Sequence, residues 1–466
     1  MTGTLDLKHL QVASTHQDIF HRSIWKQFRL ACGSSLEFTE SLVAISEHYD
    51  VVVVGRTIAS LMTATLLAKR RLRVRVLDTK FSLDPNLPVI GLETTPLLHP
   101  LLDEMGLVHD VRTRIYGPPK PITIALADRR FSMSPDGRER AVTFGEVFPN
   151  SSEALIQLFS MIEQYGPRMD GLLDGSIELS ADGFRAKRGL DRLADESGLS
   201  SLAQEHSPWS TDPIIADFVK ALLVVGGRLD GGPEYVTPAA LRTLWHLCFG
   251  IPRIRRGRAG LEELLAQKLL TTGGTIEEHR IAHSFDIRRK RVRAIETTDG
   301  ATFGADAIIL AGGPACLAQL SGEELATQHI GHVQTVAVPD NEVPTPFQDP
   351  CGWIQTPGGP AVLARPRDGR IDLMSTESES PSLTTLLPMS QISRPASSQI
   401  QWAGTNTIDV FGFCTANLRS PLKNLLYVGE AIMPGLGIEG DCVTAYQAAE
   451  AVSAAKTSRW PFGNRL

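Results

Sequence analysis

Residues 49–80 read YDVVVVGRTIASLMTATLLAKRRLRVRVLDTK, and this stretch decides the fold of the chain. The apolar run at 51–54 predicts a buried strand. A helical run over 58–70 follows, and a second strand-like run over 72–77 ends at Asp78. A strand, a turn, a helix and a second strand, with an acidic residue about 20 positions on, are typical of a βαβ dinucleotide-binding unit.

The turn between the first strand and the helix carries an incomplete glycine fingerprint. The three positions of Gly-x-Gly-x-x-Gly are occupied here by Gly55, Thr57 and Ser60. Gly55 retains the tight turn, and Ser60 is small enough for close packing of helix on strand. Thr57 is the serious departure, because its β-branched side chain obstructs the approach of the backbone to phosphates. Arg56 either offsets this by reaching a phosphate oxygen or is simply solvated.

The composition is that of an ordinary globular protein. The 466 residues are enough for about two or three domains, and a net charge of −6 gives no reason to expect nucleic-acid binding. Six scattered cysteines without C-x-x-C spacing indicate neither a disulfide framework nor a zinc site. Because no apolar run is long enough for a membrane span and no signal-peptide pattern is present, we expect a cytoplasmic protein, either free or peripheral to a membrane.

Residues 1–48 precede the first strand and form an N-terminal arm. One stripe of apolar side chains within it predicts an amphipathic helix: Ile19, Phe20, Ile24, Trp25 and Phe28. The arm either packs on its own protein or binds a partner protein or a membrane surface.

The middle of the chain has a different pattern from residues 49–80. A strand hairpin is predicted over 121–133, with Asp136-Gly137 as a turn signal, and 166–250 is mostly helical. A polar, proline-bearing loop over 375–395 is either a lid or a solvated segment. We interpret 84–250 with 314–415 as a substrate-side domain.

Regular alternation of helices and strands returns after residue 250. A helix is predicted over 257–270, and Asp299-Gly300 indicates a hairpin turn. Strand-like segments accompany these features at 275–276, 281–287, 291–297 and 307–310, the last followed by Gly312.

The C-terminal part carries a second strong pattern. An apolar strand over 424–428 ends in Gly429-Glu430, and the glycine-rich loop 433–440 (MPGLGIEG) leads into a helix predicted over 441–456. The amides at the start of that helix would point at an anionic or electron-rich group.

No catalytic acid or base stands out. His279 and His283 are four residues apart, which suits a metal on a helix, but they fall on predicted strands, so we expect no metal site. His99, Trp245 and His246 either line a substrate cavity or pack in the core, and packing is favoured because such residues are often partly buried.

The order of these segments resembles the FAD-dependent phytoene desaturase and amine oxidase superfamily. The segment LLHPLLDEMGL at 97–107 is similar to the helix that follows the second strand in phytoene-desaturase-like members. The other blocks that carry the resemblance are 51–55, Asp78, 257–274 with its following strands, 307–313 and 424–440, the last being the most specific.

The resemblance implies an α/β, two-domain flavoprotein fold that holds FAD by two separate segments. It divides the chain into the arm (1–48), a Rossmann-like FAD-binding domain (49–83, 251–313 and 416–457), a mixed α+β substrate-side domain (84–250 and 314–415) and a tail (458–466).

The resemblance also implies which residues contact the cofactor. The turn after the first strand would face the pyrophosphate, Asp78 the adenosine ribose, backbone at Ile281 the adenine, and Glu430 the second phosphate or the ribityl chain. Gly437 and Ile438 would approach the flavin ring. The full implied set is Gly55, Arg56, Thr57, Ser60, Asp78, Ile281, Gly312, Gly429, Glu430, Gly435, Gly437 and Ile438. The chain departs from the family at Thr57, at Glu430 (usually aspartate) and in lacking a Gly-Gly pair shortly after Asp78.

We therefore expect an FAD-dependent oxidoreductase, namely a dehydrogenase, desaturase or isomerase, that acts on a small apolar substrate. The alternative is a non-redox relative that serves as a binding or scaffolding subunit, with FAD binding lost or purely structural, as Rab GDP-dissociation inhibitors resemble flavoproteins without acting as such. The intact glycine loop at 435–440 favours the first hypothesis, and Thr57 with the missing Gly-Gly pair favours the second. The catalytic residues and the oligomeric state stay open.

Overall fold

The chain divides into two compact units, residues 1–44 and residues 45–466, and the second contains every described residue. The computed structural model describes residues 45–79, 91–92, 98–117, 119, 121–126, 130–172, 184–199, 212–227, 229, 237–323, 329–337, 352–355, 361–367, 370–375, 396–402 and 411–459. The helix predicted in the arm and the loop predicted over 375–395 therefore lie outside the described residues, apart from residue 375 itself.

The first sheet is built on parallel strands, as the βαβ pattern predicts. Its order is β5–β2–β1–β7–β13, and β6 pairs antiparallel with both β5 and β7. In register, Val53 of β1 lies between Val76 and Ile309. The strands are β1 (Glu47–Val54), β2 (Val74–Thr79), β5 (Thr275–Arg288), β6 (Arg291–Thr297), β7 (Thr302–Ala311) and β13 (Leu425–Val428).

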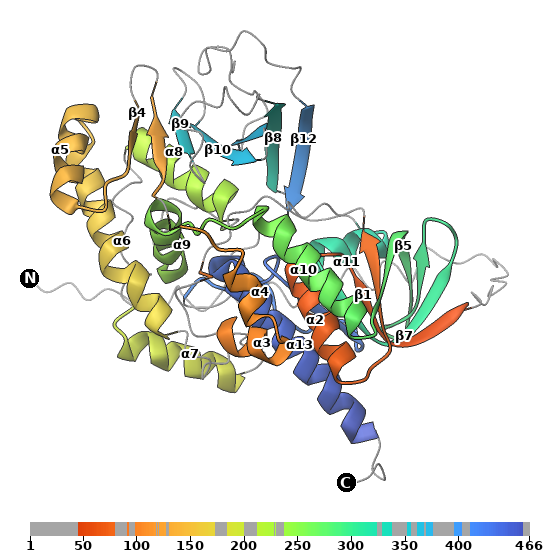
Figure 1. Ribbon diagram of the computed structural model, residues 1–466. Coiled ribbons are helices and arrows are strands. Elements are labelled where there is room, and N and C mark those ends of the chain that lie inside the picture. The colour runs from red at the N-terminus through yellow and green to blue at the C-terminus, as the bar shows by residue number, and fades with distance from the viewer. Residues whose placement is uncertain are drawn as a thin grey trace, which may run out of the picture. The chain divides into compact units, whose positions relative to one another are not determined.

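The centre of this sheet is fully covered. The valines at 51–54 of β1 are 0% exposed, as expected for a parallel strand with helices on its faces. Helix α2 (Ile58–Lys69) is buried along nearly its whole length, and it lies against α10 (Gly257–Thr271) and α13 (Ile438–Arg459) (Figure 1). An apolar helix without a polar face is a core helix, so the glycine turn before it is held rigidly.

Two local predictions in this sheet were wrong. The segments 275–276 and 281–287 form one strand, β5, because residues 278–280 bulge between Glu277, opposite Leu77, and Ile281, opposite Asp78. The C-terminal helix begins at Ile438 and not at Asp441, so the end of the glycine loop is already helical. The hairpin turn at Asp299-Gly300 is confirmed between β6 and β7.

The second sheet has seven strands in the order β12–β8–β11–β10–β9–β3–β4. Its pairs are antiparallel except β3 with β9. The hairpin predicted over 121–133 is confirmed as β3 and β4, but the turn signal Asp136-Gly137 was wrong: Asp136 accepts the Arg138 amide at 2.7 Å and caps a helix. The strands are β3 (Thr123–Ala125), β4 (Arg130–Ser132), β8 (His329–Ala337), β9 (Gly352–Gln355), β10 (Ala361–Arg367), β11 (Arg370–Ser375) and β12 (Ala396–Trp402).

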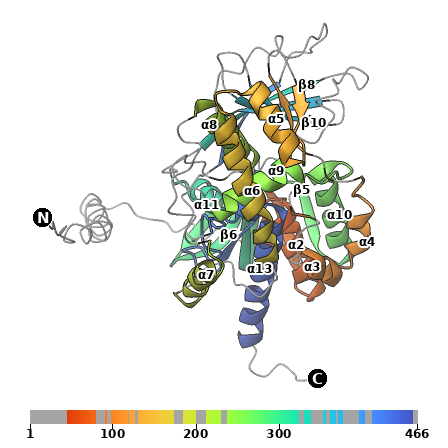
Figure 2. The same cartoon turned by 90° about the vertical axis from the view of Figure 1, so that its left-hand side faces the viewer.

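The remaining helices surround these sheets. Helix α6 lies along α9, close enough that a Cβ on Gly166 would be 2.5 Å from the Cβ of Trp245 (Figures 1 and 2). Of the three residues for which core packing was favoured, His246 is fully buried and Trp245 is partly buried against the core. The packing prediction was wrong for His99 of α3, which is exposed. These helices are α3 (Leu98–Met105), α4 (Val108–Arg112), α5 (Gly137–Val147), α6 (Ser152–Leu172), α7 (Phe184–Glu196), α8 (Pro213–Lys220), the π-helix η2 (Ala221–Gly226), α9 (Pro238–Phe249), α11 (Gly313–Ser321) and the 3-10 turn η4 (Pro434–Leu436).

Candidate functional site

The turn after β1 requires a glycine. Gly55 has φ +98°, and its amide donates to the Leu77 carbonyl at 2.9 Å, which ties the turn to the end of β2. A Cβ here would lie 2.9 Å from the Cβ of Ala311 at the end of β7. The first position of the fingerprint is therefore fixed by both backbone conformation and space.

Thr57 and Ser60 form a reciprocal capping box at the start of α2. The Thr57 amide donates to the Ser60 hydroxyl at 2.7 Å, and the Ser60 amide donates to the Thr57 hydroxyl at 3.3 Å. The box satisfies two of the donors that a helix start otherwise offers to a ligand. The two residues that replace glycines thus stabilise the helix by themselves and leave fewer amides for phosphates.

A cavity of about 110 Å³ lies in front of this turn, at the carboxyl end of the parallel strands. Five elements converge on it: the turn after β1, the first residues of α10, the end of β7, the end of β13 and the start of α13. Its lining residues are Arg56, Thr57, Arg258, Glu262, Gly312, Val428, Gly429, Glu430, Ala431 and Asp441.

Arg258, in the first turn of α10, is held by three carboxylates in this cavity. Its Nη2 lies 2.8 Å from Asp441 Oδ2, its Nη1 bonds Glu430 Oε1, and its Nε lies 3.7 Å from Glu262 Oε1. Arg258 and Asp441 are almost completely buried. Sequence reasoning found Glu430 but missed Arg258, Glu262 and Asp441, because Arg258 and Glu262, both on α10, meet Asp441 of α13 only in the folded chain.

The cavity shifts the ionisation of its own groups. Burial raises the pKa of Asp441 to about 7 despite the attraction of Arg258, and the charges of Glu430 and Glu262 act in the same direction as burial. Burial likewise raises the pKa of Glu262. Burial opposes the charged form of Arg258, but Glu430 and Asp441 outweigh it and raise the pKa of the guanidinium.

Asp78 and Ile281 lie together at the same edge of the sheet. They are opposite each other in the β2–β5 register. Asp78 is partly buried, and its Oδ1 accepts the Thr79 amide at 2.8 Å. The Ile281 carbonyl accepts the Thr298 amide at 2.9 Å. The structure therefore places side by side the two residues predicted for the ribose and the adenine.

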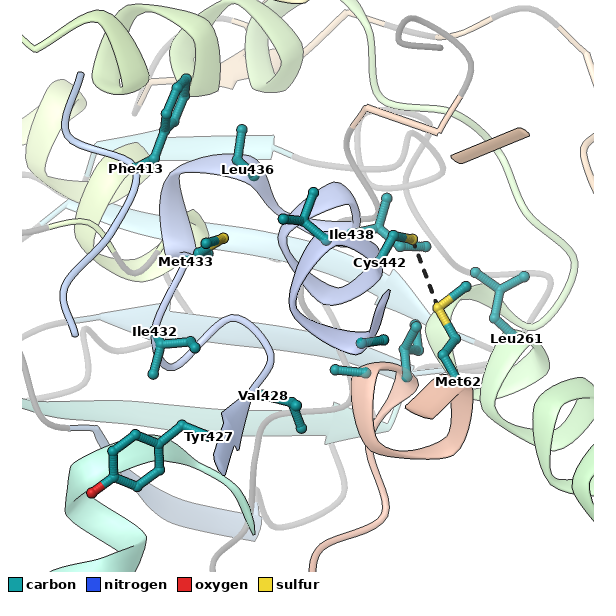
Figure 3. Close-up of a cluster of buried hydrophobic side chains, with 14 of the residues drawn as sticks. Met62, Leu261, Phe413, Tyr427, Val428, Ile432, Met433, Leu436, Ile438 and Cys442 are labelled. Carbon is teal, nitrogen blue, oxygen red and sulfur yellow. Dashed lines mark hydrogen bonds between the residues drawn. The ribbon is translucent and has the colours of Figure 1, made fainter. Parts of the chain in front are cut away.

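The glycine loop before α13 is packed in the protein interior. A Cβ on Gly435 would lie 2.9 Å from the Cβ of Ala239 in α9, and Gly437 takes φ +57° and is buried. Ile438 joins an apolar cluster with Met62, whose Sδ lies 3.7 Å from Cys442 Sγ (Figure 3). The gap beside Ile438 is about 10 Å³, which is at the limit for one water molecule. None of these three predicted residues lines the cavity.

A second buried ion-pair cluster links α9 to α6 and to the first turn of α13. Arg242 is 0% exposed; its Nε donates to Asp170 Oδ1 at 2.7 Å, and its Nη2 bonds Glu439 Oε2. His246 Nε2 lies 3.3 Å from Asp170 Oδ1. A Cβ on Gly91 would collide with the Glu439 carboxylate. The cluster therefore joins helices from three distant parts of the chain.

The contacts within this cluster determine which of its side chains are charged. Burial alone would raise the pKa of Asp170, but His246 and Arg242 lower it to about 2. Burial lowers the pKa of His246, so the imidazole is neutral at neutral pH. Burial opposes the charged form of Arg242, but Glu439 and Asp170 raise the pKa of the guanidinium above its ordinary value.

His279 and His283 both lie on β5, as predicted. Within the described ranges, no group of three or more His, Cys, Asp and Glu side chains is arranged to hold a metal ion. None of the helices in that part of the chain is long and apolar enough to cross a membrane.

No protein-family model matches the chain, and no curated protein matches it. Among solved structures, an oxidoreductase from Methanosarcina mazei is 14% identical, with 86% of this chain and 99% of that chain covered and a TM-score of 0.51. A Rab GDI from Plasmodium falciparum is 11% identical, covering 86% of this chain and 98% of that chain, with a TM-score of 0.46. A p-nitrophenol 4-monooxygenase from Pseudomonas putida is 15% identical, covering 89% of this chain and 81% of that chain, with a TM-score of 0.45.

Because the sequence identities are this low, the comparisons support conclusions about the fold alone. The chain has an α/β, two-domain flavoprotein fold, with a Rossmann-like parallel sheet and a second, mainly antiparallel sheet. The expected fold class is thereby confirmed. What the site does has to be argued from its own residues.

Proposed function

We propose that the chain binds FAD at the carboxyl edge of its parallel sheet and acts as an FAD-dependent oxidoreductase. The observation that carries the proposal is the shared cavity: the turn after β1 and the residues around the start of α13, more than 350 positions apart in sequence, line one space. Ligands of open α/β sheets bind at this edge, where strand order reverses.

The residues at the end of the site that would hold the adenosine and the diphosphate are chemically suited to FAD. The Arg56 side chain is 37% exposed and lines the cavity beside the start of α2, so a guanidinium and a helix dipole both favour a phosphate there. Gly312 and Gly429 line the same space without a Cβ. Asp78, beside Ile281, offers a carboxylate to ribose hydroxyl groups.

When bound, FAD would supply the acceptor for a hydride from the substrate. The chain's own residues would bind and orient it: Arg56 would attract the diphosphate, and Asp78, which does not line the cavity, would hold the ribose. Arg258 fixes the Glu430 and Asp441 carboxylates in the cavity wall. A dehydrogenation, desaturation or isomerisation of a small apolar molecule follows from the family resemblance.

The test is the flavin content of the purified protein. We expect a yellow protein, or a colourless one that takes up added FAD and then shows the flavin absorption band. Arg56→Met should weaken FAD binding about ten- to hundredfold, since one charge-assisted hydrogen bond is lost. Arg138→Met, an exposed arginine on α5, is the matched control and should bind like wild type. Colourless protein that takes up no FAD refutes the proposal.

A second candidate, a non-redox binding subunit of the same fold, is favoured by two observations. Arg258 is already neutralised by carboxylates within the cavity, and Gly437 and Ile438 are buried where the resemblance implies contact with the flavin ring. Both reduce the space and the positive charge available to FAD. The same FAD titration separates the candidates, because a binding subunit without cofactor stays colourless.

A further inference from the structure

We propose that the cavity in front of α2 takes up one proton together with its anionic ligand, and that the Asp441 carboxylate receives this proton. The inference rests on the proposed function, in which the ligand carries a diphosphate. It adds a pH dependence that the fold does not imply: the ligand binds more tightly as the pH falls toward 7.

The charges in the cavity wall are unbalanced. Two guanidinium groups, those of Arg56 and Arg258, face three carboxylates, those of Glu262, Glu430 and Asp441, which leaves one negative charge in excess. A dinucleotide diphosphate brings two more negative charges into the same space. Like charges at such short range disfavour each other, so neutralising one carboxylate relieves the largest repulsion.

Asp441 is the carboxylate best placed to be neutralised. Its Oδ2 is paired with Arg258 at 2.8 Å, whereas Oδ1 is fully buried and has no hydrogen bond of ordinary geometry. Oδ1 faces Gly429 in the cavity wall, where a Cβ would be 3.2 Å from it. The Glu430 backbone amide is directed at the Asp441 carboxylate and favours its ionised form, but Oδ1 keeps no hydrogen bond of ordinary geometry. A proton from solvent placed on Oδ1 makes this oxygen a donor beside the ligand.

The neighbouring carboxylates are less suited to this role. The Glu430 side chain is 10% exposed and the Glu262 side chain 19%, against 1% for Asp441. Ionisation therefore costs most at Asp441, whose pKa burial has already raised to about 7. Among the described residues that line the cavity, Arg56 is the other charged group; its side chain is 37% exposed, and its Nη1 lies 3.9 Å from Oε1 of the exposed Glu278 side chain.

The direction of the pH dependence follows by linkage. A bound diphosphate adds negative charge and raises the pKa of Asp441 further, so the complex holds more protons than the free protein above pH 7. The dissociation constant should be constant below about pH 7 and should rise up to tenfold per pH unit above it.

The experiment is a calorimetric titration of the full-length protein with FAD between pH 6 and pH 9. FAD is a suitable probe because its diphosphate, esterified at both ends, keeps its charge over this range. Titrations at pH 8 in two buffers of different ionisation enthalpy count the protons taken up, and we expect a value approaching one for wild type.

Two variants complete the test. Asp441→Asn removes the titrating group, so its affinity for FAD should not vary between pH 6 and pH 9 and should exceed that of wild type at pH 9. Glu450→Gln, on the exposed side of the same helix, should keep the wild-type pH profile. The proton count on wild type needs no variant and stands even if Asp441→Asn does not fold.

The outcomes separate the inference from the proposed function. FAD binding with pH-independent affinity and no proton uptake overturns the inference and leaves the function intact. An unchanged pH profile in Asp441→Asn likewise overturns the assignment to this carboxylate. Absence of FAD binding by wild type and variant alike, at every pH, overturns both.

Discussion

Arg242→Met should destabilise the protein strongly. The guanidinium is fully buried, and its removal takes this cation away from two carboxylates, Asp170 and Glu439, whose side chains are 11% and 0% exposed. Asp170 keeps its contact with the His246 imidazole at 3.3 Å. Breaking a buried ion pair by deleting one partner costs about 3–5 kcal/mol, because an uncompensated charge stays in the interior. Because two buried carboxylates lose the same cation at once, we expect a loss within this range.

The assay is equilibrium urea unfolding, followed by far-UV circular dichroism at pH 7. Replacing both carboxylates as well, in Arg242→Met/Asp170→Asn/Glu439→Gln, should recover much of the loss, because buried groups of similar shape without charge avoid the desolvation penalty. Arg138→Met, with an exposed side chain, should leave the urea midpoint unchanged.

The deficit of Arg242→Met should also shrink as the pH falls. Without the guanidinium the pKa values of Asp170 and Glu439 rise, and protonation then neutralises the two carboxylates that have lost this cation. A loss below about 1 kcal/mol at pH 7, or a loss that does not change between pH 7 and pH 4, would refute the view that this cluster is a buried, mutually dependent set of charges.

Three further outcomes are expected. Thr57→Gly removes the hydroxyl that caps the Ser60 amide and should cost only about 0.3 kcal/mol in urea unfolding, because glycine is itself a good N-cap residue. FAD affinity should rise about tenfold in a fluorescence titration as the backbone becomes approachable. Asn424→Ala leaves both backbone groups of Val292, each bonded at 3.0 Å, unsatisfied, and should cost about 1–3 kcal/mol per group by the same unfolding assay. Because burial lowers the pKa of His246, the unfolded chain binds more protons and stability should fall as the pH drops below about 6.5; His246→Gln should flatten that dependence in urea midpoints measured from pH 7 to pH 5.

The sequence was sufficient where one continuous segment determines a structure. The valine run at 51–54, the turn at Gly55 and the apolar helix after it form a local unit whose hydrophobic pattern, turn and helix start all favour the same fold. The hairpin at Asp299-Gly300 is local in the same sense. At Asp136 the local pattern was ambiguous, because an aspartate before a glycine starts a turn or caps a helix equally well, and the residues that follow decide.

The charged clusters could not be predicted because their members come from distant segments. Arg258 meets Asp441 across 183 positions, and Arg242 meets Glu439 across 197. One signal was present nevertheless: Arg242 interrupts the apolar run of α9, and a charge on a buried helix face demands a partner. The identity of that partner depends on the packing of α9 against η4 and the start of α13, which a single sequence does not encode locally.

The first turn of α13 carries two carboxylates, Glu439 and Asp441, each gripped by a different arginine. The N-terminal end of this long helix, where the helix dipole is positive, therefore already carries two carboxylates of the protein itself. A substitution in α9 that releases Glu439 would loosen the same helical turn that holds Asp441. A substitution in α9 would therefore change ligand binding in the cavity through α13, although the substituted residue does not contact the ligand.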